Sequence, residues 1–167
     1  QQNSLLGLPS STRDFRSISG ASNRAMRVLE VAAEADYQHF LLFNSADGTL
    51  NNIITILNGV DGIYQSQLNL HVSLVYTHIH TNISSQPYSA SDPDASHLLD
   101  QLQTYWGNNF EGSVSSDTVH FFTGIRPTSP VVGLAYIGGA CTRRFQYGLS
   151  TVAGIGSAQT VLTAHEL

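Results

Sequence analysis

Apolar residues recur at helical spacing in two parts of the chain. In the first part they are Leu50, Ile53, Ile54, Leu57, Val60 and Tyr64. This i, i+3, i+4, i+7 spacing predicts an amphipathic helix over residues 47–67, with Asp47 as its N-cap. In the second part they are Leu98, Leu99, Leu102, Tyr105, Trp106 and Phe110. That stripe predicts a helix that starts with Asp92 as N-cap and Pro93 at its first position. A third helix is predicted over residues 157–167.

Alternating apolar and polar residues predict strands around these helices. The strongest run covers residues 68–80, where one face is formed by Leu68, Leu70, Val72, Leu74, Tyr76 and His78. Val75 and Ile79 make the other face partly apolar, which predicts an interior strand in a sheet that is covered on both sides. Four more strands are predicted, over residues 27–36, 118–122, 133–138 and 147–152.

The order of these elements, β-α-β-α-β-β-β-α, predicts the fold class. Helices that alternate with strands at this spacing indicate an α/β fold with a mostly parallel, twisted five-stranded sheet and flanking helices. The short run 133–138 lies between two loops and is predicted to be the one antiparallel strand, at an edge of the sheet. Residues 26–167 form a single domain in this interpretation. Residues 1–25 lack periodicity and are interpreted as a linker or the end of a preceding segment.

Composition narrows the classes of function. Charged residues make up 11% of the chain and the net charge is −5, so no nucleic-acid partner is predicted. No apolar run reaches the roughly 18 residues that a membrane helix needs. The low charge and the many Ser, Thr, Asn and Gln residues favour an exported protein, and we expect a secreted or extracytoplasmic location. The chain also has no Gly-x-Ser-x-Gly motif, no phosphate-binding glycine loop and no Cys-x-x-Cys pair.

Three polar side chains leave alternatives open. Cys141 is the only cysteine of the chain, and it is either a small buried hydrophobe or half of a disulfide. His78 and His80 are two residues apart on a predicted strand, so they share a face. They could form a metal-binding pair, although a merely polar strand end is the favoured interpretation.

The chain ends with Ala164-His165-Glu166-Leu167, and His-Glu opens the zinc-protease motif His-Glu-x-x-His. Upstream lie three segments that also carry a family resemblance: residues 27–36, 116–124 and 132–141. Together with the predicted helices, they resemble the catalytic domain of adamalysin/reprolysin-type metzincins over about 140 of the 167 residues. The most specific part is Gly-Leu-Ala-Tyr at 133–136, followed by Cys141 and by the terminal Ala-His-Glu-Leu in register.

The resemblance implies a zinc-dependent endopeptidase that hydrolyses peptide or protein substrates by metal-activated water. His165 resembles the first zinc ligand of that family, and Glu166 resembles its general base. The edge strand that pairs with an extended substrate would include Gly133, Leu134, Ala135 and Tyr136. Glu30 matches the position of a calcium-binding glutamate, with Asp94 as a suggested partner, so Ca²⁺ is a candidate second ion besides Zn²⁺. Cys141 matches a cysteine that forms a disulfide in the family.

The second and third histidines of the family motif do not occur after Glu166. The resemblance therefore implies an incomplete and inactive fragment, which is the upper subdomain of a metzincin domain and could bind its own missing C-terminal part. The alternative is a non-catalytic metzincin-like module that binds extended peptides along its sheet edge.

Overall fold

The computed structural model describes residues 25–167 apart from residues 92, 129 and 153–155. Its elements in chain order are β1 (Arg27–Ala35), α1 (Tyr37–Phe43), α2 (Ala46–Leu68), β2 (Leu70–Ile79), the 3₁₀ helix η1 (Ile83–Ser85), α3 (Ala95–Asn109), β3 (Thr118–Thr123), β4 (Gly133–Ala135), β5 (Tyr147–Thr151) and α4 (Ser157–Glu166). The segment predicted as a linker lies almost wholly outside the described residues. None of the helices formed by the described residues combines the length and the apolar character that a membrane crossing needs.

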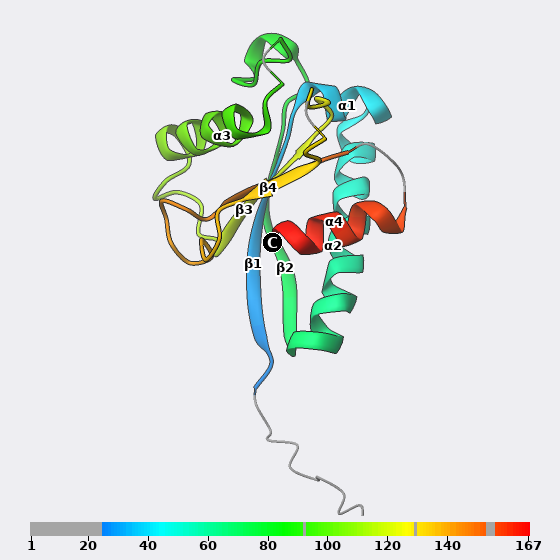
Figure 1. Ribbon diagram of the computed structural model, residues 1–167, viewed down its shortest axis with the longest axis vertical. Coiled ribbons are helices and arrows are strands. Elements are labelled where there is room, and N and C mark those ends of the chain that lie inside the picture. Colours follow the sequence, from blue (N-terminus) through cyan, green and yellow to red (C-terminus); the bar gives the residue numbers. More distant parts are fainter. Residues whose placement is uncertain (1–24, 92, 129, 153–155) are drawn as a thin grey trace, which may run out of the picture.

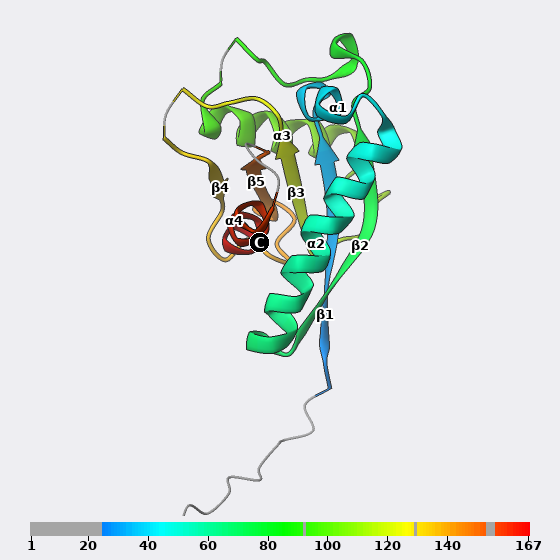
Figure 2. The same ribbon diagram turned by 90° about the vertical axis from the view of Figure 1, so that its right-hand side faces the viewer.

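The five strands form one sheet in the order β2-β1-β3-β5-β4, which confirms the predicted fold class. Strands β1, β2, β3 and β5 are parallel, and β4 alone runs antiparallel, beside β5. Figures 1 and 2 show α2 and α4 on one side of this sheet and α3 on the other. Two apolar cores follow from that layering. One lies between the sheet and α2, and the other lies between the sheet and α3.

Strand β2 is not the interior strand that its pattern predicts. Among the strands of the described residues it pairs with β1 alone, so it forms an edge of the sheet. Its outward-facing Val75 is 40% exposed. The prediction failed because apolar residues on both faces of a strand indicate only that helices cover the sheet above and below it. Helices α2 and α3 do cover part of β2 in this way. The pattern carries no information about a neighbouring strand at the side.

A register shift divides β2 into two halves. Val31 of β1 pairs with Leu74, but the next residue, Ala32, pairs with Tyr76. The extra residue, Val75, forms a bulge, and a bulge of one residue exchanges the faces of a strand whose side chains alternate. Leu74 accordingly packs in the α2 core and Tyr76 in the α3 core. The single face predicted along the whole of residues 68–80 is therefore wrong.

The helices begin at caps close to the predicted ones. Ser45 caps α2, not Asp47, and Asp94 caps α3. Asp92, the predicted cap of α3, lies outside the described residues. In both cases the capping oxygen accepts a backbone N–H of the first turn. Several cap-forming residues precede each helix, and periodicity alone does not select among them.

Helix α4 is held across α2 by close contacts between small residues. A Cβ atom on Gly59 of α2 would lie 2.6 Å from Thr160 Cγ2 of α4, so the glycine allows the two helices to approach. About one turn further along each helix, the Tyr64 hydroxyl donates a hydrogen bond of 2.9 Å to the Ala164 carbonyl. These contacts fix the end of α4, and with it His165 and Glu166, relative to the sheet.

We expect Gly59→Ala to destabilise the protein and Gly62→Ala to stabilise it. Both glycines lie in α2, where alanine gains about 1 kcal/mol in helix propensity. A Cβ atom on Gly62 meets nothing within 4 Å, so that gain is retained. On Gly59 the added methyl group pushes α4 away, and overpacking of this kind costs about 1–3 kcal/mol. Urea denaturation of both variants measures the difference, and equal gains would show that α4 does not pack tightly on α2.

Candidate functional site

The carboxylate of Glu166 lies directly against the edge strand β4. A Cβ atom on Gly133 would stand 2.5 Å from Glu166 Oε1, and one on Gly148 of β5 would stand 3.0 Å from the Glu166 carbonyl oxygen. A side chain at Gly133 would push the Glu166 carboxylate aside, and one at Gly148 would press on the end of α4. The structure thus brings together two groups of residues that were predicted separately, the motif at 165–166 and the strand at 133–136.

Partial burial changes the acidity of Glu166. Removal of water from its carboxyl group raises its pKa, and the neighbouring His165 acts in the opposite direction without cancelling the effect. A carboxyl group with a raised pKa holds its proton more readily than one in water. That property suits a group that accepts a proton and later gives it away.

The side chain of His165 is exposed on α4, beside a shallow hollow lined by Ser157, Ala158, Val161 and Leu162. An exposed imidazole fits zinc chemically as one ligand, but a catalytic zinc site needs three protein ligands. Within the part of the chain that the structure describes, no cluster of three metal-ligating side chains includes His165. The residues present therefore supply one ligand of such a site and do not complete it.

Strand β4 has the form expected of a strand that can pair with a peptide. It bonds to β5 through Gly133, Leu134 and Ala135, and no described strand lies on its other side. Tyr136 follows the strand, and its hydroxyl donates to Asp100 of α3 over 3.2 Å. The three strand residues and Tyr136 are half-buried. Their binding of substrate stays a prediction.

Glu30 and Cys141 lie near each other, with Asp117 between them. The Asp117 carboxylate accepts hydrogen bonds from the Glu30 backbone N–H at 2.9 Å and from the Cys141 thiol at 3.3 Å. Glu30 itself is exposed. Its suggested calcium partner, Asp94, caps α3. Calcium needs six to eight oxygen ligands, and no group of three metal-ligating side chains among the described residues contains Glu30. The calcium site therefore stays a prediction.

The thiol of Cys141 is exposed. This excludes the interpretation of Cys141 as a small buried hydrophobe, and it leaves the sulfur accessible for a disulfide. The hydrogen bond to Asp117 and the charge of that carboxylate raise the pKa of the thiol. Cys141 thus lies in an environment that favours the thiol over the reactive thiolate.

Sequence reasoning underestimated a buried polar cluster on the other face of the sheet. Glu34 of β1 is fully buried and faces α3, and its two oxygens contact His78 at 3.1 Å and His80 at 2.6 Å. Trp106 Nε1 and the Tyr88 hydroxyl each donate to Glu34 over 3.0 Å. The bulge in β2 places His78 on this face, and the alternation in the sequence does not reveal it.

The charge state of the cluster follows from its contacts. Burial acts to raise the pKa of Glu34, but hydrogen bonds and charges from His78 and His80 outweigh it, and the pKa lies below its ordinary value. Burial and the nearby Glu34 charge raise the pKa of Tyr88 well above the ordinary value for tyrosine. Glu34 is therefore an anion, and Tyr88 keeps the proton that it donates to Glu34.

His120 of β3 is also fully buried. Its Nε2 contacts Ser150 Oγ at 2.9 Å, and its Nδ1 has no hydrogen-bond partner among the residues that the structure describes. Burial lowers the pKa of His120 to about 3. The ring is thus neutral under ordinary conditions and serves the packing of α4 and β5, with no sign of a ligand role.

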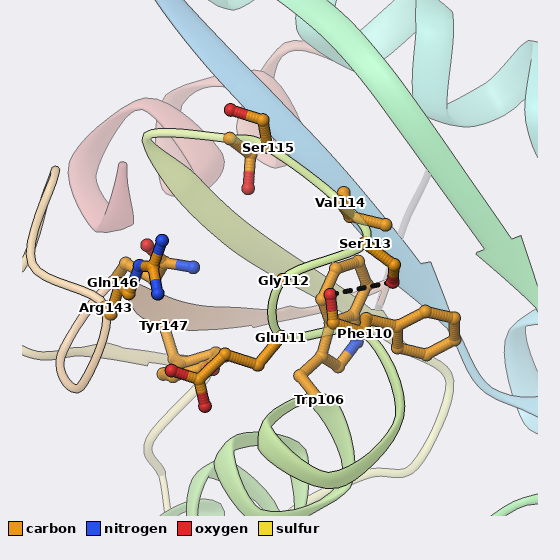
Figure 3. Close-up of a pocket in the computed structure, with 11 residues that line it drawn as sticks. Trp106, Phe110, Glu111, Gly112, Ser113, Val114, Ser115, Arg143, Gln146 and Tyr147 are labelled. Atoms are coloured by element: carbon orange, nitrogen blue, oxygen red, sulfur yellow. Dashed lines mark hydrogen bonds between the residues drawn. The ribbon is translucent and has the colours of Figure 1, made fainter.

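A hollow of about 200 Å³ lies beyond the C-terminal end of α3 (Figure 3). Arg143 and Gln146 lie on one side of it, and Trp106 and Phe110 on the other. The hollow contains none of the site residues predicted from the sequence, and its lining shows no cluster of metal-ligating side chains among the described residues. The hollow is therefore separate from the candidate site at the end of α4 and along β4.

Two comparisons with known proteins bear on the fold and the family of this chain. A solved structure titled "Structure of a chaperone-substrate complex" superposes with a TM-score of 0.63 at 12% sequence identity, which supports the fold alone. The match covers 84% of this chain and 23% of that chain, so the present chain spans less than a quarter of its length. A family model described as metallo-peptidase family M12 matches residues 23–167. The match includes both β4 and the His-Glu pair at the end of α4, and it confirms the resemblance seen in the sequence. The chain therefore belongs to metallopeptidase family M12, as a domain of the reprolysin type.

Proposed function

We propose that this domain belongs to a zinc-dependent endopeptidase in which Glu166 is the general base and β4 aligns the substrate. The observation that supports the proposal is the contact between the Glu166 carboxylate and Gly133. It supports a role for this carboxylate as a proton acceptor beside the strand to which we propose that an extended peptide binds. Membership of a metallopeptidase family supports the same reaction class.

The substrate would extend β4 by one strand. An unpaired strand edge offers backbone N–H and C=O groups, so a peptide can bind through its own backbone with little dependence on its side chains. Strand β4 pairs with β5 along one edge through Gly133, Leu134 and Ala135, and no strand of the described residues pairs with its other edge. A peptide bound there would pass the end of α4, where Glu166 lies.

Glu166 would take a proton from the water that attacks the peptide carbonyl and deliver it to the leaving amine. Its raised pKa supports both steps, because a base with a pKa closer to neutral also returns the proton readily. A zinc ion bound in part by His165 would acidify that water and polarise the carbonyl. The other zinc ligands of the family motif are not among these 167 residues. Catalysis is therefore proposed for a longer form of the protein, and no hydrolysis is expected from the present chain alone.

This proposal carries two further expectations, one about a disulfide and one about the location of the protein. The exposed thiol of Cys141 would form a disulfide with a cysteine outside the present residues, because the chain has no second one. A protein with such a disulfide would be located outside the cytoplasm, where disulfides persist. The low content of charged residues, 11%, is consistent with that location.

We expect Glu166→Gln to reduce peptide hydrolysis by about 100-fold or more, because glutamine cannot accept the proton. The measurement uses the longest natural form of the protein with zinc present and a quenched fluorescent peptide library as substrate. Glu111→Gln changes an exposed glutamate after α3 and is the matched control, with hydrolysis at the wild-type rate. Hydrolysis retained in Glu166→Gln would refute the role of Glu166. Peptide binding without hydrolysis in the wild type would favour the non-catalytic module.

A further inference from the structure

We propose that Glu34, His78 and His80 form a binding site for one divalent first-row transition-metal ion, on the sheet face opposite to Glu166. One ligand atom from each residue lies within 4.8 Å of the other two. The ligand atoms of a tetrahedral zinc site, with bonds of about 2.0–2.1 Å, lie about 3.3 Å apart. The distances from the Glu34 oxygens to His80 Nε2 and His78 Nδ1 are 2.6 Å and 3.1 Å. To admit the ion, the Glu34–His80 pair would have to widen by about 0.7 Å, and no pair of ligand atoms would have to close by more than about 1.5 Å, which side-chain rotation can supply.

The backbone of two paired strands fixes the three ligands. Glu34 of β1 pairs with His78 of β2 in the parallel register, and the backbone N–H of His80 bonds to the Ala35 carbonyl over 2.9 Å. His78 and His80 are two residues apart on the strand, so they share a face. The bulge at Val75 turns that face toward Glu34. Sites supported by strands keep their geometry better than sites on loops.

A second layer of side chains orients the ligands. Trp106 Nε1 donates to one oxygen of Glu34 and the Tyr88 hydroxyl to the other, both over 3.0 Å. The ring of His78 stacks on Tyr105 with centroids 6.0 Å apart, and the ring of His80 packs against Tyr88 at 5.7 Å. Hydrogen bonds and packing of this kind hold metal ligands in place and raise their affinity for the ion.

The site is open on one side only. The side chain of His78 is 29% exposed, whereas those of His80 and Glu34 are 2% and 0% exposed. An ion would therefore enter past His78, and water would complete its coordination from the same side. Three protein ligands with an open position differ from a closed structural zinc site, which has four.

The ligand types select the class of ion. Two imidazoles and one carboxylate suit Zn²⁺, Ni²⁺, Cu²⁺ or Fe²⁺, whereas Ca²⁺ and Mg²⁺ prefer oxygen ligands alone. When both imidazoles bind an ion through unprotonated nitrogens, they and the carboxylate together carry one negative charge, which favours a divalent cation. In the absence of an ion, the same three groups form a buried hydrogen-bonded cluster. A purely structural cluster is the competing account.

The test is cobalt and zinc binding to the tag-free 167-residue chain after treatment with a chelator. We expect one Co²⁺ ion to bind with visible ligand-field absorption, and Zn²⁺ to displace it. His78→Ala should weaken the affinity for either ion by about 100-fold or more. Loss of a residue that only supports a ligand already costs about 10–100-fold in affinity, and loss of a ligand itself should cost at least as much. His78 is not a member of either apolar core, but its ring packs on Tyr105 and Phe110, so circular dichroism is used to check that the variant is folded.

Two control variants separate this site from other histidines. His71→Ala removes a partly exposed histidine from the same strand, and His165→Ala removes the ligand proposed for the catalytic zinc. Both should bind cobalt as the wild type does. Histidine-ring NMR of the wild type gives a readout that needs no variant, because zinc should shift the ring signals of His78 and His80. Absence of stoichiometric binding, affinity unchanged in His78→Ala, or loss of binding in His165→Ala would each overturn the proposal.

Discussion

Replacement of Glu34 by alanine should lower the free energy of unfolding by about 3–5 kcal/mol in metal-free buffer. The Glu34 carboxylate accepts hydrogen bonds from Tyr88 and Trp106 and contacts His78 and His80, and it is fully buried. Its removal leaves these buried donors without an acceptor, and each unsatisfied buried group costs about 1–3 kcal/mol. The loss is large relative to the total stability of about 5–15 kcal/mol that is typical of domains.

Urea denaturation monitored by the fluorescence of Trp106, the only tryptophan, measures this change. Glu30→Ala is the matched control, because it removes an exposed glutamate from the same strand, and surface changes usually stay within about 0.5 kcal/mol. Glu34→Gln should lie between the two, since its amide oxygen still accepts one of the hydrogen bonds. If Glu34→Ala were no less stable than Glu30→Ala, the buried cluster would contribute nothing to the fold.

A second large effect is expected from His120 when the pH is lowered. The pKa of His120 is about 3 in the folded protein, whereas an unfolded histidine has a pKa near 6.5. Between these values the unfolded chain binds one more proton than the folded chain does. The stability that comes from neutral His120 is therefore fully present above about pH 6.5. It is lost as the pH falls toward 3, at about 1.4 kcal/mol for each pH unit. At pH 4 the loss is about 3 kcal/mol.

The variant His120→Gln tests this effect, because glutamine can still bond to Ser150 Oγ but carries no proton in this pH range. The free energy of unfolding is measured by urea denaturation from pH 4 to pH 8 for both proteins. The difference between wild type and variant should be constant above about pH 7 and should change steadily below pH 6. Parallel curves over the whole range would show that folding does not lower the pKa of His120.

Local sequence patterns predicted much of the fold. Helical spacing around Leu57 and Leu102 located α2 and α3, and the helix ends were correct to within a few residues. The alternation of helices and strands indicated a mostly parallel sheet, and the short run at 133–138 indicated its antiparallel edge. These features depend on neighbours in the sequence, whose spacing is set by the pitch of a helix or the pleat of a strand.

The candidate site was predictable only in part. His165, Glu166 and the strand at 133–136 were found from motifs, but their contact was not, since it depends on Gly133 and Gly148 making room for the end of α4. Glu34 was not singled out at all. A lone glutamate among alanines in a strand gives no signal of its partners, which lie 44 to 72 positions away in the chain.

The sequence by itself determined the fold class and the family, because both follow from short local patterns. These patterns can be identified without knowledge of tertiary contacts. Only the tertiary structure decided that β2 is an edge strand and that its bulge at Val75 turns His78 toward Glu34. It also decided that His120 is buried without a partner for Nδ1. The physical reason is common to these cases. Periodicity states which side chains share a face, whereas register and packing between distant segments decide what that face meets.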